Sequence, residues 1–67
     1  MARGTVKWFS DPKGYGFIHA EDRQDVYVHF SAIEGSGFRT LHEGEHVEFE
    51  IRSSERGSEA AHVTRID

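Results

Sequence analysis

Residues 15–20 and 25–29 alternate between two kinds of side chain with the period of two that is typical of β-strands. In the first segment an aromatic ring or imidazole occupies every second position, at Tyr15, Phe17 and His19. Small or aliphatic residues stand between them, and in the second segment Tyr27 and His29 alternate with valines. Each segment therefore has a ring side and an aliphatic side. Because a small barrel has a single core, one of these sides must face outward.

Three further segments are expected to be strands. Thr, Val, Trp and Phe favour a strand over residues 5–10, and residues 46–52 place Val47, Phe49 and Ile51 on one side. In residues 60–66, Ala61 and Val63 are the expected core pair. Lys7, Trp8 and Phe9 cannot all face one way without a bulge or strong local twist.

The connections between these strands are polar and mostly short. The sequence DPKG, residues 11–14, matches a type I turn, with Asp11 first, Pro12 second and Gly14 fourth. EDRQ and SSERGSE form two more polar turns, and SAI could form a single helical turn. Residues 34–44 hold three glycines and have no regular period, which predicts a long loop of the kind that often carries function.

Five short strands without a substantial helix or an internal repeat predict an all-β fold. A flat sheet would leave two open edges and one bare apolar face, whereas closing the sheet into a barrel hides both. The expected core is Val6, Ile18, Val26, Val28, Ile33, Val47, Phe49, Ile51 and Val63.

Composition limits the possible classes of protein. With 67 residues the chain is expected to form one domain, residues 1–67, around one small core. It has no cysteine, so disulfides and thiolate metal sites are excluded. No apolar run approaches the ~18 residues of a membrane span, and the first residues show no apolar signal core. We therefore expect a cytoplasmic protein whose whole sequence lies in the fold.

The net charge of −4 at first argues against a nucleic-acid partner, but its distribution weakens that argument. Residues 1–41 hold five basic and five acidic side chains, whereas residues 42–67 hold three basic and seven acidic ones. The acidic surplus therefore lies in the C-terminal part, and local charge decides where a polyanion can dock.

The ring side of the predicted sheet has a chemistry suited to unpaired nucleic acid. Flat rings stacked on bases contribute ~1–3 kcal/mol per base with little regard to sequence, and lysines or arginines follow the phosphates. A duplex is a poor fit because its base faces are covered. Aromatic residues in strands also serve simply as packing, and an exposed apolar patch could instead dock a protein or a second copy of the chain. These alternatives remain open from the residues alone.

The sequence HEGEH, residues 42–46, formally satisfies the zinc-protease pattern H-E-x-x-H. That chemistry needs a helix, so that both imidazoles share a face with the glutamate. Gly44 interrupts the pattern and an alternating strand follows at once, so we expect a loop that leads into the fourth strand. We expect no enzyme activity, no metal and no cofactor.

Several segments together resemble the bacterial cold-shock domain in order and spacing. They are GTVKWF, KGYGFI, DVYVHFSAI, GFRTLHEGEHVEFE and AAHVTRI, and KGYGFI and VYVHF are similar to that family's two ribonucleoprotein motifs. The resemblance covers essentially the whole chain. It implies a five-stranded antiparallel Greek-key barrel of the oligonucleotide-binding type (OB-fold). It also implies sequence-tolerant binding of single-stranded RNA and DNA, preferably pyrimidine-rich, by a monomeric RNA chaperone that affects transcription and translation.

The same resemblance implies which residues bind the nucleic acid. Base-stacking positions match Trp8, Phe17, Tyr27, His29, Phe30 and Phe38, with Tyr15 at a ring position usually held by Phe and Phe9 at a less central one. The cationic rim matches Lys7, Lys13 and Arg56, and Asp25 matches a carboxylate that can accept from a base edge. Departures from the family pattern stand at Ser10, Pro12, Ser58, Glu59 and His62. These departures are expected to change the affinity and not the mode of binding.

Overall fold

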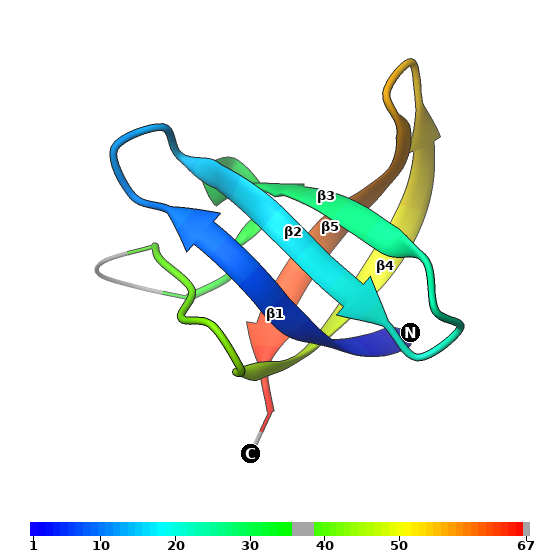
Figure 1. The fold of residues 1–67 in the computed structure, drawn as a ribbon, viewed down its shortest axis with the longest axis horizontal. Helices are drawn as coiled ribbons and strands as arrows, with labels where there is room; N and C mark the ends of the chain where they lie inside the picture. The colour runs from blue at the N-terminus through cyan, green and yellow to red at the C-terminus, as the bar shows by residue number, and fades with distance from the viewer. Residues whose placement is uncertain (36–38, 67) are drawn as a thin grey trace.

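A computed structural model describes residues 1–35 and 39–66. Five strands follow one another along the chain (Figure 1): β1 (Ala2–Ser10), β2 (Tyr15–Ala20), β3 (Asp25–His29), β4 (His46–Ser54) and β5 (Gly57–Arg65). A single 3₁₀ turn, η1 (Phe30–Ala32), follows β3. The predicted bounds of β2 and β3 are confirmed, whereas β1, β4 and β5 extend beyond the segments that alternation marked. No helix of the described part is long and apolar enough to cross a membrane.

The strands close into a barrel in the order β1-β2-β3-β5-β4, which confirms the predicted fold class. The pairs β1–β2, β2–β3, β1–β4 and β4–β5 are antiparallel. The contact that closes the barrel is a short parallel one, with Tyr27 of β3 opposite Glu59 of β5. The segment after η1 extends this contact along β5, where Ile33 forms a parallel bridge with Val63 and the amide of Glu34 donates to the carbonyl oxygen of Val63 at 2.8 Å.

The β1–β2 turn joins two strands whose register is interrupted once. Gly14 has a φ of 76° and donates its amide hydrogen to the carbonyl oxygen of Ser10, so the turn closes on Ser10 and not on Asp11 as predicted. In β1, Val6 pairs with Ile18 and Trp8 pairs with Phe17, which leaves Lys7 as the extra residue of a bulge. This confirms that residues 7–9 need a bulge. It lets Trp8 face outward while Phe9 packs against the core.

The interior is apolar throughout, and no buried polar side chain occurs among the described residues. Eleven hydrophobic residues form it: Val6, Ile18, Ala20, Val26, Val28, Ile33, Leu41, Val47, Phe49, Ala60 and Val63. Eight of the nine predicted core residues belong to this set. Leu41 was not predicted, because the loop that carries it has no periodicity from which a buried position could be read.

The prediction that Ile51 lies in the core is wrong, since it is 39% exposed. It follows Val47 and Phe49 on the same side of β4, but pairing of β4 with β1 ends at Phe49. Beyond that point β4 is paired only with β5, in a hairpin that projects from the barrel (Figure 1). Strand alternation therefore continues where there is no longer a core to face.

The prediction that Ala61 packs beside Val63 is also wrong, because Ala60 is buried in its place. Two residues of β5, His62 and Val63, stand opposite Phe49 alone, so the register shifts by one residue. His62 adopts a φ of 53° in this bulge. The extra residue reverses the alternation and brings Ala60 and Val63, three positions apart, to the same side.

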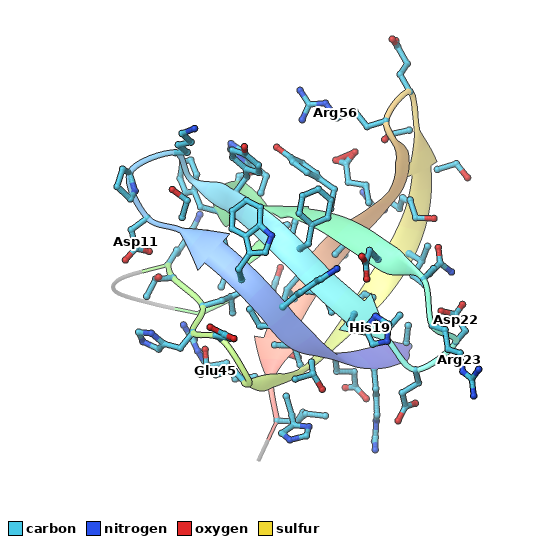
Figure 2. The ribbon with its side chains drawn as sticks, in the orientation of Figure 1. Asp11, His19, Asp22, Arg23, Glu45 and Arg56 are labelled. Carbon is cyan, nitrogen blue, oxygen red and sulfur yellow. The ribbon has the colours of Figure 1, made fainter. Side chains whose placement is uncertain are left out.

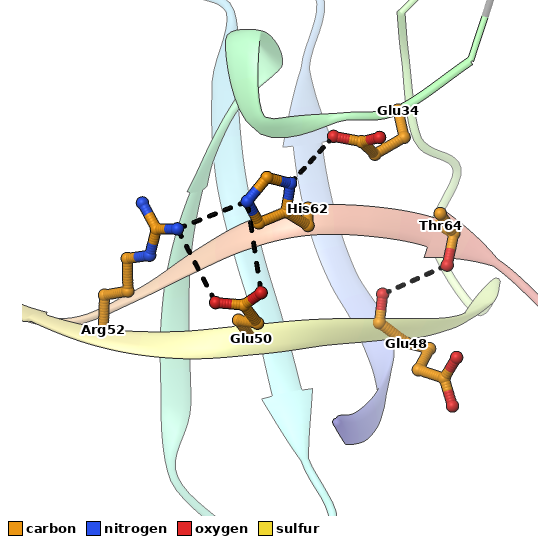
Figure 3. Close-up of polar contacts among 6 residues, drawn as sticks. All are labelled: Glu34, Glu48, Glu50, Arg52, His62 and Thr64. Atoms are coloured by element: carbon orange, nitrogen blue, oxygen red, sulfur yellow. Dashed lines mark hydrogen bonds and ion pairs between the residues drawn. The ribbon is translucent and has the colours of Figure 1, made fainter.

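Polar contacts surround this bulge on β4 and β5 (Figure 3). The imidazole of His62 lies 3.0 Å from a carboxylate oxygen of Glu34 through Nδ1, and 3.2 Å from the Arg52 guanidinium through Nε2. On the other side of the bulge, the Thr64 hydroxyl donates to the carbonyl oxygen of Glu48 at 3.5 Å. His62, which differs from the residue of the family pattern, therefore contacts β4 through Arg52 and the segment after η1 through Glu34.

Candidate nucleic-acid interface

Aromatic side chains from β1, β2 and β3 meet on the outer surface of the barrel. Register places Phe17 opposite Tyr27, Tyr15 opposite His29, and Trp8 opposite Phe17. Paired residues in an antiparallel sheet project to the same side, so the rings form one continuous surface. The ring face, as we call it, consists of Trp8, Tyr15, Phe17, Tyr27, His29 and Phe30.

Contacts between neighbouring rings hold the ring face together. Tyr15 and Tyr27 stack with their centroids 5.7 Å apart and an interplanar angle of 27°. Trp8 meets Tyr15 and Phe17 at 5.6 and 5.7 Å, and Phe17 meets Tyr27 edge-on at 6.0 Å. The rings of Tyr15, Phe17 and Tyr27 are half-buried because each covers part of the next, whereas Trp8 and Phe30 are 40% and 44% exposed.

His29 and Phe30 continue the ring face where β3 passes into η1. Their ring centroids lie 4.6 Å apart. The Nδ1 atom of His29 accepts from the backbone amide of Ser31 at 3.3 Å, so His29 is the N-cap of the 3₁₀ turn. This contact fixes the orientation of the imidazole, and in the neutral ring it leaves the proton on Nε2.

Two shallow hollows open at or beside this surface. One, of about 670 Å³, is lined by Phe9, Phe30, Arg39 and the β1–β2 turn, including Lys13. The other, of about 470 Å³, lies over Tyr15, Phe17, Tyr27 and Arg56. Pro12, one of the departures from the family pattern, lines the first hollow, so it contributes to the surface as well as to the turn.

The three cations that the family resemblance implies for the rim, Lys7, Lys13 and Arg56, lie on strands and turns that adjoin the ring face. The guanidinium of Arg56 lies 4.9 Å from the centroid of the Tyr27 ring, a cation–π contact. Figure 2 shows Arg56 reaching from the β4–β5 turn, so the projecting hairpin supplies a cation to a ring on the neighbouring strand β3. Lys13 belongs to the β1–β2 turn, where its backbone amide donates to the Ser10 hydroxyl at 3.3 Å.

The third cation, Lys7, is held by an acid. Its Nζ atom donates to Oδ2 of Asp25 at 2.8 Å, and Oδ1 of Asp25 lies 2.9 Å from Nδ1 of His19. The hydrogen bond from Lys7, followed by that from His19, lowers the pKa of the Asp25 carboxyl below its ordinary value. Asp25 therefore remains ionised near neutral pH. His19 was not predicted as a site residue, although alternation already places it in one row with Tyr15 and Phe17.

Gly16 lies beneath the ring face on β2, where it pairs with Phe9 of β1. An absent side chain could let a ligand approach the backbone, but here the space belongs to β1. A Cβ atom on Gly16 would lie 2.2 Å from the carbonyl oxygen of Trp8 and 2.7 Å from Cα of Phe9. Gly16 is therefore required by strand packing beneath the ring face.

Two remaining predictions concern the loop between η1 and β4. Phe38, a predicted base-stacking residue, lies outside the described residues. The HEGEH segment forms a turn followed directly by β4, as expected: Gly44 has a φ of 89°, and the His42 amide donates to the Glu45 carboxylate at 2.6 Å. Within residues 1–35 and 39–66, no group of three or more potential ligands is arranged to hold a metal ion.

Comparison with known proteins agrees with this geometry. Residues 2–66 match the family model of the 'Cold-shock' DNA-binding domain. This chain is a member of the cold-shock domain family. It is 59% identical over 66 residues to the cold shock-like protein CspLB of Listeria monocytogenes, covering 98% of this chain and 100% of that protein. It is 56% identical to the cold shock protein CspB of Bacillus caldolyticus, with the same two coverages.

The fold is shared with more distant cold-shock domains. The solved structure of drosophila Unr CSD456 superposes with a TM-score of 0.80 at 22% sequence identity. The match covers 98% of this chain but 26% of that chain, which is much longer. At this identity the likeness concerns the barrel alone.

Proposed function

We propose that this cold-shock domain binds single-stranded RNA and DNA through the ring face and acts, without catalysis, as an RNA chaperone in the cytoplasm. The observation that carries the proposal is the unbroken run of outward rings across three strands, bordered by Lys7, Lys13 and Arg56. Rings of this kind can stack on bases only when the base faces are open, which favours a single strand over a duplex.

The energies of the two competing interactions support chaperone action. Each base that stacks on a protein ring gains ~1–3 kcal/mol, whereas each base-pair step of a duplex contributes about 1.4 kcal/mol. A surface that captures several bases therefore shifts weak local pairing toward the open strand but leaves long helices intact. This balance would change the secondary structure of messenger RNAs, and in that way affect transcription and translation without catalysis.

We also propose that pyrimidine-rich strands are preferred and that the monomer is the binding unit. Preferences of this class of surface come from stacking strength and backbone flexibility, and not from base-specific hydrogen bonds. Pyrimidines stack weakly on one another in a free strand, so they lose less on transfer to the ring face.

The test is a fluorescence titration, because Trp8 is the only tryptophan and lies within the ring face. A short oligothymidylate is expected to quench Trp8, and the matching duplex to bind much more weakly. With two to three cations releasing counterions from a single strand, the slope of log K against log salt should be roughly −1.5 to −2. Absence of quenching at low salt would overturn the proposal.

A protein-docking or dimerisation module remains the second candidate, because the large apolar side chains of Trp8 and Phe30 are both exposed on the ring face. Size-exclusion measurements distinguish the two. Dimerisation that is insensitive to salt, together with a lack of oligonucleotide binding, would favour the docking module.

A further inference from the structure

His19 extends the outer row of β2 by one step beyond Phe17. It pairs with Asp25 of β3 on one side and with Thr5 of β1 on the other, so it projects from the same surface as the rings. Its side chain is 55% exposed, and Figure 2 shows it near the end of β2. A single strand that stacks on Tyr15 and Phe17 and continues along β2 therefore reaches the imidazole.

Asp25 determines which atom His19 presents. Because the carboxylate can only accept, the proton of the neutral imidazole lies on Nδ1, 2.9 Å from Oδ1 of Asp25. The Nε2 atom is then an unprotonated acceptor. The same carboxylate holds Lys7 at 2.8 Å, so one acid orients both a cation and an imidazole at this end of the ring face.

Protonation of His19 changes both the charge and the hydrogen-bonding character of this edge. The charged groups that face His19 are Lys7 from β1, Asp25 from β3 and Asp22 from the β2–β3 turn. When His19 is neutral, the net charge of Lys7, Asp25, Asp22 and His19 together is −1. When His19 is protonated, that net charge is 0. At the same time Nε2 turns from an acceptor into a charged donor, the form that binds a phosphate oxygen.

We propose that His19 is a further contact of the bound single strand, and that protonation of its imidazole strengthens nucleic-acid binding at lower pH. This inference rests on the proposed function. It assigns to the domain a pH-dependent phosphate contact that is separate from base stacking.

The experiment measures the dissociation constant of oligothymidylate at pH 8 and pH 5.5 for the wild type and four variants, His19→Gln, His19→Lys, His46→Gln and His29→Gln. One additional phosphate contact at ~0.1 M salt should tighten wild-type binding about five-fold at the lower pH, and should steepen the salt slope by about 0.7. The variant His19→Gln should lose most of this response. His19→Lys, which carries a permanent charge, should bind at both pH values about as tightly as the wild type does at pH 5.5.

His46→Gln provides the matched control. His46 pairs with the same Thr5 as His19 does, but from β4, on the other side of β1 from His19. This variant should keep the full pH response. Thermal unfolding of each variant at both pH values establishes that the compared proteins are folded.

The outcomes separate the inference from the function on which it rests. A wild type that binds equally at both pH values, or a His19→Gln variant with the full response, overturns the inference and leaves single-strand binding standing. A response that disappears in His29→Gln but persists in His19→Gln also overturns it, since it would then come from the imidazole within the ring face. A wild type that binds at neither pH refutes the proposed function itself.

Discussion

Phe17 is the residue whose removal tests base stacking most directly. It lies at the centre of the ring face, with Trp8 at 5.7 Å on one side and Tyr27 at 6.0 Å on the other. Replacing it with alanine removes one stacking surface, worth ~2 kcal/mol within the usual range for one base. This corresponds to an increase of roughly 30-fold in the dissociation constant, at about 1.4 kcal/mol per factor of ten.

The same substitution has a limited effect on the fold, because the ring lies outside the barrel. It removes two aromatic pairs, each worth ~0.5–1.5 kcal/mol, but creates no cavity in the core. We therefore expect Phe17→Ala to have a lower melting temperature and to remain folded. Anisotropy of a labelled oligothymidylate is the suitable assay, since Phe17 contacts Trp8 and the substitution alters tryptophan fluorescence directly.

Ile51→Ala is the matched control, because Ile51 is an exposed apolar residue on the projecting part of β4 and is absent from the ring face. Its affinity should equal that of the wild type, and Phe17→Tyr should bind nearly as well as the wild type. A folded Phe17→Ala variant with the wild-type dissociation constant would show that the rings serve only to pack the strands.

Two further predictions concern stability. Gly16→Ala should lower the melting temperature by more than 5 °C, or prevent folding, because its Cβ would meet the β1 backbone at 2.2 Å and overpacking costs ~1–3 kcal/mol or more. Gly44→Ala would meet no atom within 4 Å, so in the same thermal melt it should show only the cost of an alanine at a φ of 89° and no loss of folding. The pKa of the Asp22 carboxyl is lowered in the fold, chiefly by the hydrogen bond from the Gln24 side chain. The ionised carboxylate therefore stabilises the folded protein above the unfolded-state pKa, and this stabilisation is lost as the pH falls through the folded-state pKa. Asp22→Asn should therefore flatten the decline of the urea midpoint below about pH 4, and an unchanged decline would contradict this assignment.

Much of the fold could be predicted from short-range pattern. Alternation located β2 and β3 to the residue and predicted most of the core positions that lie on strands, because a strand with one buried face must repeat every two residues. The same pattern predicted that Tyr15, Phe17, Tyr27 and His29 share one side. Residues 7–9, where the pattern conflicts with a regular strand, indicated the bulge of β1.

Other features depend on contacts between residues that are distant in sequence. Ile51 continues the alternation of β4, and only the end of pairing with β1 shows that it lies outside the barrel. Leu41 has no local pattern, yet it is buried because closure of the barrel brings its loop over the core. His62 adopts its bulge conformation in a register that β4 and β5 set together.

The interface shows the same division. The residue types of the proposed base-stacking surface were determined by the sequence itself, since rings, cations and their spacing along each strand are local properties. Which cation meets which ring or acid was decided by tertiary structure: Arg56 reaches Tyr27 only because the β4–β5 hairpin lies beside β3, and Asp25 holds Lys7 and His19 only because β1, β2 and β3 are adjacent. A charge can be orientated by an acid only at a distance of a few ångströms, and in this chain such distances are set by how the barrel closes.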